Sequence, residues 1–263
     1  MVLTENPTRR LLTGASKVPE VTAAFWVIKV LTTGMGETAS DYLTHQLIPE
    51  LAVALGAAGF VLALVLQLAV RRYIPWIYWA TVVMVSVFGT MCADVLHVGL
   101  GVPYTASTLG FLVVLAAVFL LWRRSEGTLS IHSIVTRRRE IFYWMVVVTT
   151  FALGTAAGDL TAMTLNLGHL GSGLIFAVVI AIPALAFWKF RLNAVAAFWF
   201  AYIVTRPLGA SLADWMAVPE GRGGLNWGAG PVTVGLTTLI VVAVGLLSLR
   251  QSRHSSLRGQ HLG

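Results

Sequence analysis

Charged residues are scarce in this chain, and cysteine is almost absent. Only 11% of the 263 residues are Asp, Glu, Lys or Arg, whereas ordinary soluble domains contain about a quarter. Hydrophobic residues make up 57%. This composition excludes an ordinary soluble domain and predicts a membrane protein that crosses the bilayer several times. The single cysteine, Cys92, excludes an internal disulfide and a cysteine metal cluster.

The sequence motifs of the common enzyme classes are also missing. We find no nucleophile elbow, phosphate-binding glycine loop, HExxH metalloprotease motif or CxxC pair. We therefore expect a protein that is not an enzyme and that has no cofactor.

One motif does occur, four times over. An aromatic pair is followed at fixed distances by a glycine and an aspartate, in the pattern [FY]-W-x9-G-x4-D. Four copies in one chain are a strong signal of tandem repeats. The copies are VTAAFWVIKVLTTGMGETASD (21–41), IPWIYWATVVMVSVFGTMCAD (74–94), REIFYWMVVVTTFALGTAAGD (139–159) and AVAAFWFAYIVTRPLGASLAD (194–214).

Apolar segments predict two membrane helices for each repeat. A bilayer core of about 30 Å needs about 20 helical residues. Eight segments meet this length: 20–43, 50–70, 74–97, 105–122, 141–163, 170–189, 193–216 and 229–249. The expected fold is an all-α membrane protein of four helical hairpins. We expect a lead (1–18), a membrane domain (19–250, with repeats 19–72, 73–123, 138–190 and 191–250) and a tail (251–263).

Basic residues predict the orientation of these helices. The net charge of +7 gathers on alternate loops, as the positive-inside rule requires of cytoplasmic segments. We therefore place both termini in the cytoplasm and expect the lipid bilayer, not nucleic acid, as the partner. The sequence leaves open whether the protein forms a homo-oligomer. All four motif helices then run outward, as parallel copies related by pseudo-symmetry about the membrane normal. The basic residues are Arg9, Arg10, Lys17, Arg71, Arg72, Arg123, Arg124, Arg137, Arg138, Arg139, Lys189, Arg191, Arg250, Arg253 and Arg258.

The first motif, with its lead-in KVPEVTAAFWVIKVLTTGMGETASD (17–41), also indicates a family. The chain resembles, over roughly residues 17–250, the bacterial membrane proteins built from four tandem repeats of unknown function. In that family each repeat has two transmembrane segments and a characteristic tryptophan. The resemblance implies a membrane fold, and a bacterial inner membrane as the location, but no activity.

A polar stripe runs along the first motif helix. Lys29, Thr33, Glu37 and Asp41 are four residues apart and share one face. Later repeats contribute Ser86, Thr90, Thr155 and Arg206 at equivalent positions. Lys29, Glu37 and Arg206 fall in the middle of the span, where an unpaired charge costs at least about 2.5 to 3.5 kcal/mol. If the repeats close in a ring, Arg206 approaches Glu37, either as a structural ion pair or as a coupling device.

The motif aspartates, Asp41, Asp94, Asp159 and Asp214, mark the outer helix ends. They are interpreted either as solvated end residues or as an acidic vestibule for cations. His97, three residues after Asp94, makes an Asp/His pair that could hold a metal, and His45 after Asp41 is a weaker hint of the same kind. His169 has no recognisable ligand spacing.

The remaining motif residues are expected to pack. Aromatic pairs are more often packing anchors than cation cages, and small residues let membrane helices approach closely. These positions are Trp26, Trp79, Trp144 and Trp199, and Gly36, Gly89, Gly154 and Gly209.

Two functions fit these features. The first is a transporter of a small cation, such as a divalent metal ion, coupled to protons and with the polar stripes as its path. The second is a membrane scaffold or sensor whose buried charges only hold the helices together.

Overall fold

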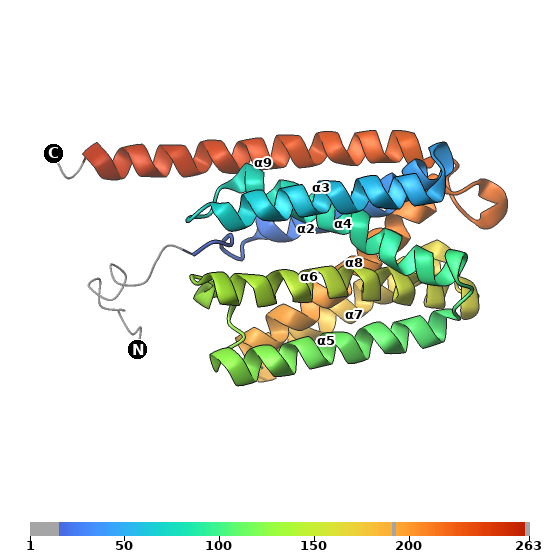
Figure 1. Ribbon diagram of the computed structural model, residues 1–263, viewed down its shortest axis with the longest axis horizontal. Coiled ribbons are helices and arrows are strands. Elements are labelled where there is room, and N and C mark those ends of the chain that lie inside the picture. The colour runs from blue at the N-terminus through green and yellow to red at the C-terminus, as the bar shows by residue number, and fades with distance from the viewer. Residues whose placement is uncertain (1–15, 191–192, 261–263) are drawn as a thin grey trace.

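The computed structural model describes residues 16–190 and 193–260 of the chain (Figure 1). These residues form eight α-helices: α2 Ala23–Gln46, α3 Pro49–Ala69, α4 Pro75–Asp94, α5 Tyr104–Glu126, α6 Arg137–Asp159, α7 Gly168–Phe190, α8 Ala194–Ala217 and α9 Ala229–Gln260. Each predicted segment corresponds to one helix. The helix α9 continues to Gln260, past the predicted end at 249 and into the predicted tail. Arg9, Arg10 and Arg191, used for the predicted orientation, lie outside the described residues, as do the side chains of Lys189, Arg253 and Arg258.

Local sequence signals set the helix ends. Thr22 precedes α2 and accepts a hydrogen bond from the Phe25 amide, and Thr136 caps α6 in the same way. Pro49 and Pro75 each begin a helix, where a missing amide hydrogen has no cost. Gly127 ends α5 with a φ of 70°, a left-handed conformation that suits glycine.

Six helices in the described part of the chain are long and apolar enough to cross a membrane, so this is a multi-pass membrane protein. They are α3, α4, α5, α6, α8 and α9. The other two fall short for different reasons. Helix α2 carries Lys29, Glu37 and Asp41. Of α7, the stretch whose side chains the structure describes without a gap, Gly168–Ile182, is apolar but shorter than a full span. For α2 and α7, a membrane span stays a prediction.

The motif helices form a closed ring. Helix α2 contacts α4, α4 contacts α6, α6 contacts α8, and α8 returns to contact α2. The outer helices follow a rule that the sequence did not predict, because the second helix of each repeat packs mainly on the first helix of the next repeat. These pairs are α3 with α4, α5 with α6, α7 with α8, and α9 with α2.

Loops alternate between the two ends of the bundle (Figure 1). The segments 70–74 and 127–136 lie at the end where α2 begins, and the segment 218–228 lies at the opposite end. Lys17 and Val18, the end of the predicted lead, are buried against this first end. Lys17 pairs with the fully buried Glu140, which also accepts a hydrogen bond from Gln67 at 2.9 Å. The chain is therefore packed into the fold before α2 starts.

Each motif glycine receives a side chain from the following repeat. A Cβ added at these glycines would overlap the incoming side chain, so only glycine permits the approach. The pairs are Gly36 with Ser86, Gly89 with Phe151, Gly154 with Arg206, and Gly209 with Thr33. These four incoming residues occupy one equivalent stripe position, three residues before the glycine of their own repeat. Each motif helix therefore accepts a side chain from the next repeat, and the last accepts one from the first, so the four contacts join the motif helices all the way around the ring.

Aromatic residues fill the ring near the start of the motif helices. Trp79, Trp144 and Trp199 are buried, and Trp26 is partly buried. The hydroxyls of Tyr78 and Tyr143 lie 2.5 Å apart, and the Phe25 ring contacts Phe198 across the closure between α2 and α8. The aromatic residues of the motif thus pack against one another around the ring.

Candidate functional site

An ion pair occupies the centre of the ring. Arg206 on α8 donates through Nη2 to Glu37 Oε2 on α2 at 2.5 Å, and its side chain is fully buried. The closure of the ring between repeats 1 and 4 thus brings together the two charges that the sequence analysis paired. Pro207, the next residue, lies inside α8 without ending it.

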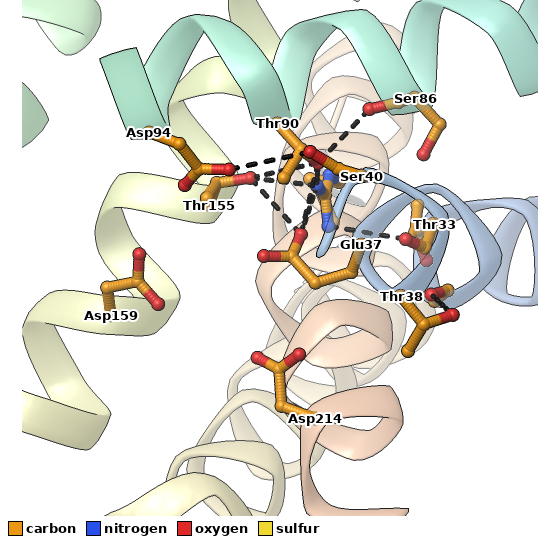
Figure 2. Close-up of polar contacts among 12 residues, drawn as sticks. Thr33, Glu37, Thr38, Ser40, Ser86, Thr90, Asp94, Thr155, Asp159 and Asp214 are labelled. Atoms are coloured by element: carbon orange, nitrogen blue, oxygen red, sulfur yellow. Dashed lines mark hydrogen bonds and ion pairs between the residues drawn. The ribbon is translucent and has the colours of Figure 1, made fainter. Parts of the chain in front are cut away.

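Hydroxyl groups from the other two motif helices complete this central cluster. Thr90 on α4 and Thr155 on α6 lie 3.2 and 3.3 Å from Glu37 Oε2. Both also accept hydrogen bonds from Arg206 Nη2, that of Thr155 at 2.8 Å. Glu37, Thr90 and Thr155 occupy the same position in successive repeats, so the symmetry of the ring makes them meet. Figure 2 shows Glu37 facing both threonines.

Lys29 lies nearer the start of α2 and has no carboxylate partner among the residues that the structure describes. Its Nζ atom makes no hydrogen bond and is 4.1 Å from the centre of the Phe151 ring and 4.3 Å from that of Tyr202. Arg206 lies 5.2 Å from the same Phe151 ring. A charge in the middle of a membrane span has to face protein or water. Lys29 faces protein, and because ring faces attract cations, these two aromatic rings surround its ammonium group.

The remaining stripe residues, Thr33 and Ser86, bond to backbone. Thr33 Oγ1 donates to the Val30 carbonyl at 2.6 Å, and Ser86 Oγ donates to the Thr32 carbonyl at 2.8 Å. Both side chains also fill glycine contacts of the preceding repeat. Their hydroxyls are thus engaged in helix packing.

A second cluster lies at the carboxyl-terminal ends of α4 and α6. One ligand atom each from Asp94, His97 and Asp159 lie within 4.8 Å of one another, so the group could hold a metal ion. Asp94 and His97 are the pair that their spacing suggested. Asp159 joins them from the next repeat. Figure 2 shows Asp94, Asp159 and Asp214 on three different helices around Glu37.

The second ring nitrogen of His97 fixes the orientation of the imidazole. His97 Nε2 lies 2.5 Å from Ser107 Oγ on α5, while Nδ1 makes no hydrogen bond within the described part of the chain and lies 3.8 Å from Asp159 Oδ2. The side chain of His97 is 3% exposed. A metal-binding histidine almost always hydrogen-bonds through its other nitrogen in this way. The free Nδ1 atom is therefore directed toward the two carboxylates.

Local helix geometry supports this arrangement. Both α4 and α6 change to a π-helix directly after their motif aspartate, as η1 Val95–Gly99 and η3 Leu160–Thr164. Single π-helical turns in α-helices are frequent at functional sites. In η1 the turn carries His97, which contacts the α5 residues Tyr104 and Ser107.

The other two aspartates have different partners. His169, at the start of α7, places Nδ1 3.4 Å from Asp214 Oδ2, a contact without a spacing signal in the sequence. Asp214 is buried rather than a solvated helix end. His45 is exposed and bonds to the backbone carbonyl of Asp41 at 2.6 Å, so the suggested Asp41/His45 side-chain pair does not form. Next to Asp41, Ser40 donates a hydrogen bond through Oγ to Asp94 Oδ2 at 3.5 Å.

The comparison with protein families agrees with this repeated architecture. The model of the family described as Repeat of Unknown Function (DUF347) matches residues 24–73, 77–128, 142–193 and 197–253. The chain belongs to this family. Each match covers one motif helix and the outer helix that follows it, which confirms the four repeats and the resemblance. Searches of curated proteins and of solved structures found no match to the chain.

Proposed function

We propose that the protein transports a small cation, with a divalent metal ion as the preferred substrate, through the ring of motif helices. The Asp94, His97 and Asp159 group carries this proposal. Two carboxylates and one imidazole suit divalent first-row metals, and three protein ligands leave positions for exchangeable water. Such an incomplete shell favours a site that binds and releases its ion.

The central ion pair fits the transport path as a closed barrier. Glu37 precedes Asp41 by one helical turn, so the central cluster lies about 6 Å deeper than the outer aspartates, toward the start of α2. The positive guanidinium group of Arg206 lies at this point, paired with Glu37. A cation can pass only if this guanidinium moves away, and protonation of Glu37 would release it. This proposal makes Glu37 the coupling group, in an inner membrane with both termini cytoplasmic.

A scaffold or sensor is the second candidate function. It is favoured by the hydrogen bonds of Arg206, which link all four motif helices through Glu37, Thr90, Thr155 and the Thr33 carbonyl. A scaffold with these contacts needs no substrate and no enzymatic activity.

Metal binding and transport separate the two functions. Purified protein in liposomes should take up Mn²⁺ or Zn²⁺, and the pair Asp94→Asn with Asp159→Asn should abolish both binding and uptake. Glu50→Gln is the matched control, because Glu50 is an exposed carboxylate in the first turn of α3 at the same end. Ser107→Ala removes the hydrogen-bond partner of His97. Loss of such a partner of a metal ligand typically weakens metal affinity about 10- to 100-fold, and we expect the same here. Uptake by the double variant at the parental rate would refute transport through this site.

A further inference from the structure

An apolar cleft opens on the outer surface of α6, between α3 and α5. It has a volume of about 380 Å³ and is lined on α3 by Leu64 and Leu68, on α5 by Val114 and Val118, and on α6 by Ile141 and Met145. Val114 and Met145 are 49% and 40% exposed in the chain. Because α3, α5 and α6 are membrane-span candidates, this cleft faces the lipid.

Three arginines lie within four residues, along the chain, of the residues that line one end of the cleft. Arg137 begins α6 one turn before Ile141, is exposed, and donates to the carbonyl of Leu68 at 3.3 Å. Arg71 and Arg72 are exposed and follow directly after the end of α3. The nearby acids already have basic partners: Glu126 is engaged by Arg138 and Arg139 at 3.3 and 2.9 Å, and Glu140 is paired with Lys17. The positive charge at the mouth is therefore left for another anion.

We propose that this cleft binds an anionic phospholipid. One acyl chain lies along α6 between α3 and α5, and the phosphate sits against Arg137 with Arg71 and Arg72. The position fits the chemistry, because these arginines mark the membrane boundary where headgroups lie. Basic residues beside a membrane contribute about 1 kcal/mol each to binding an anionic surface.

Charge also argues against a helix of a second copy in this cleft. A second copy in the same membrane orientation presents its own basic end at the same level. The exposed Arg123 and Arg124 lie in the last turn of α5, and Arg250 lies at the end of the membrane-span part of α9. Insertion of such a helix would bring like charges against Arg71, Arg72 and Arg137, whereas a phosphate neutralises them.

Native mass spectrometry of the purified protein tests the site. Detergent-solubilised protein is mixed with phosphatidylglycerol or with phosphatidylcholine of the same acyl chains, and the bound lipid is counted. We expect selective retention of phosphatidylglycerol. Arg137→Gln should reduce this preference about five-fold, the equivalent of about 1 kcal/mol. Arg137→Lys, which keeps the charge, should largely retain it.

Two further variants separate the headgroup from the chain. Val114→Trp fills the cleft from the lipid side and should remove the retained lipid while the protein keeps its thermal stability. Arg250→Gln is the charge control at the same end of the bundle and should change nothing. Inorganic phosphate should not compete, because the acyl chain supplies part of the affinity. Equal retention of both lipids, or full retention by Val114→Trp, would overturn the proposal, and dimers displaced by Val114→Trp would show a second copy in the cleft.

Discussion

The central ion pair gives the sharpest test of the ring. Glu37 and Arg206 have side-chain exposures of 6% and 0%, so neither can recover hydration when its partner is removed. Loss of one member of a buried pair typically costs about 3 to 5 kcal/mol. We therefore expect Glu37→Gln and Arg206→Gln each to lower the free energy of unfolding by about this amount. For a chain of this size, the unfolding midpoint should fall by about 6 to 20 °C.

Glutamine is the right replacement because of the glycine contact. The Cβ and Cγ atoms of Arg206 lie against Gly154, where an added methyl group would overlap them. Glutamine keeps these two carbons and removes only the charged group. An alanine would also empty the space at Gly154 and would mix a packing loss into the electrostatic one.

The double variant decides whether the two charges act together. With both replaced, no charge is left uncompensated, so stability should return to within about 1 kcal/mol of the parent and the cycle should show strong coupling. Tryptophan fluorescence during thermal unfolding in detergent provides the measurement, since the chain has nine tryptophans. The control cycle is Glu126 with Arg138, whose side chain is 69% exposed, and it should show less than about 1 kcal/mol. Additive losses at Glu37 and Arg206 would refute the paired arrangement. A stable double variant that no longer transports would identify the pair as the coupling device.

Three other perturbations test separate parts of the structure. Gly209→Ala should destabilise the protein by about 1 to 3 kcal/mol because its Cβ would overlap Thr33, whereas Gly110→Ala, which meets nothing within 4 Å, should not; equal midpoints would contradict the close approach. In a Cys92→Ala background, a cysteine replacing Arg72 should react with an impermeant thiol reagent only from the cytoplasm and one replacing Gly221 only from outside; labelling from one side would disprove the orientation. Lys29→Met keeps the contact with Phe151 and Tyr202 but removes the charge, so thermal stability should be kept or increased while metal uptake falls; unchanged uptake would place Lys29 outside the path.

Much of the fold follows from periodic features of the sequence. The apolar segments and the four motif copies give the helices and the repeats, because both depend on local sequence. The approach of Arg206 to Glu37 also follows once the ring is assumed to close. Thr90 and Thr155 join them because they hold the position of Glu37 in their own repeats. Symmetry thus predicts contacts between equivalent positions.

Contacts made by the connecting segments were not predictable in this way. His97 reaches Asp159 because η1 contacts α5, which packs on α6, and His169 reaches Asp214 because α7 lies against α8. Within their own repeats, His97 follows Asp94 by three residues and His169 follows Asp159 by ten. Because the two spacings differ, no repeated pattern in the sequence predicts these contacts. The surroundings of Lys29 could not be predicted from the sequence either. Phe151 and Tyr202 come from two other repeats, and at their stripe positions they are aromatic rather than charged. Tertiary packing alone brings these groups together.

The shift of each outer helix onto the next repeat explains how a symmetric ring can carry unsymmetric chemistry. Each aspartate of repeats 2 to 4 meets a residue of the repeat before it: Asp94 meets Ser40, Asp159 meets His97, and Asp214 meets His169. The glycine contacts repeat in all four copies and hold the frame, so the residues at these junctions are free to differ. Only the junction between repeats 2 and 3 unites two carboxylates with a histidine in the part of the chain that the structure describes. A single group that could hold an ion in a four-fold frame is therefore the outcome expected when duplicated repeats keep their packing positions and diverge at the contacts between them.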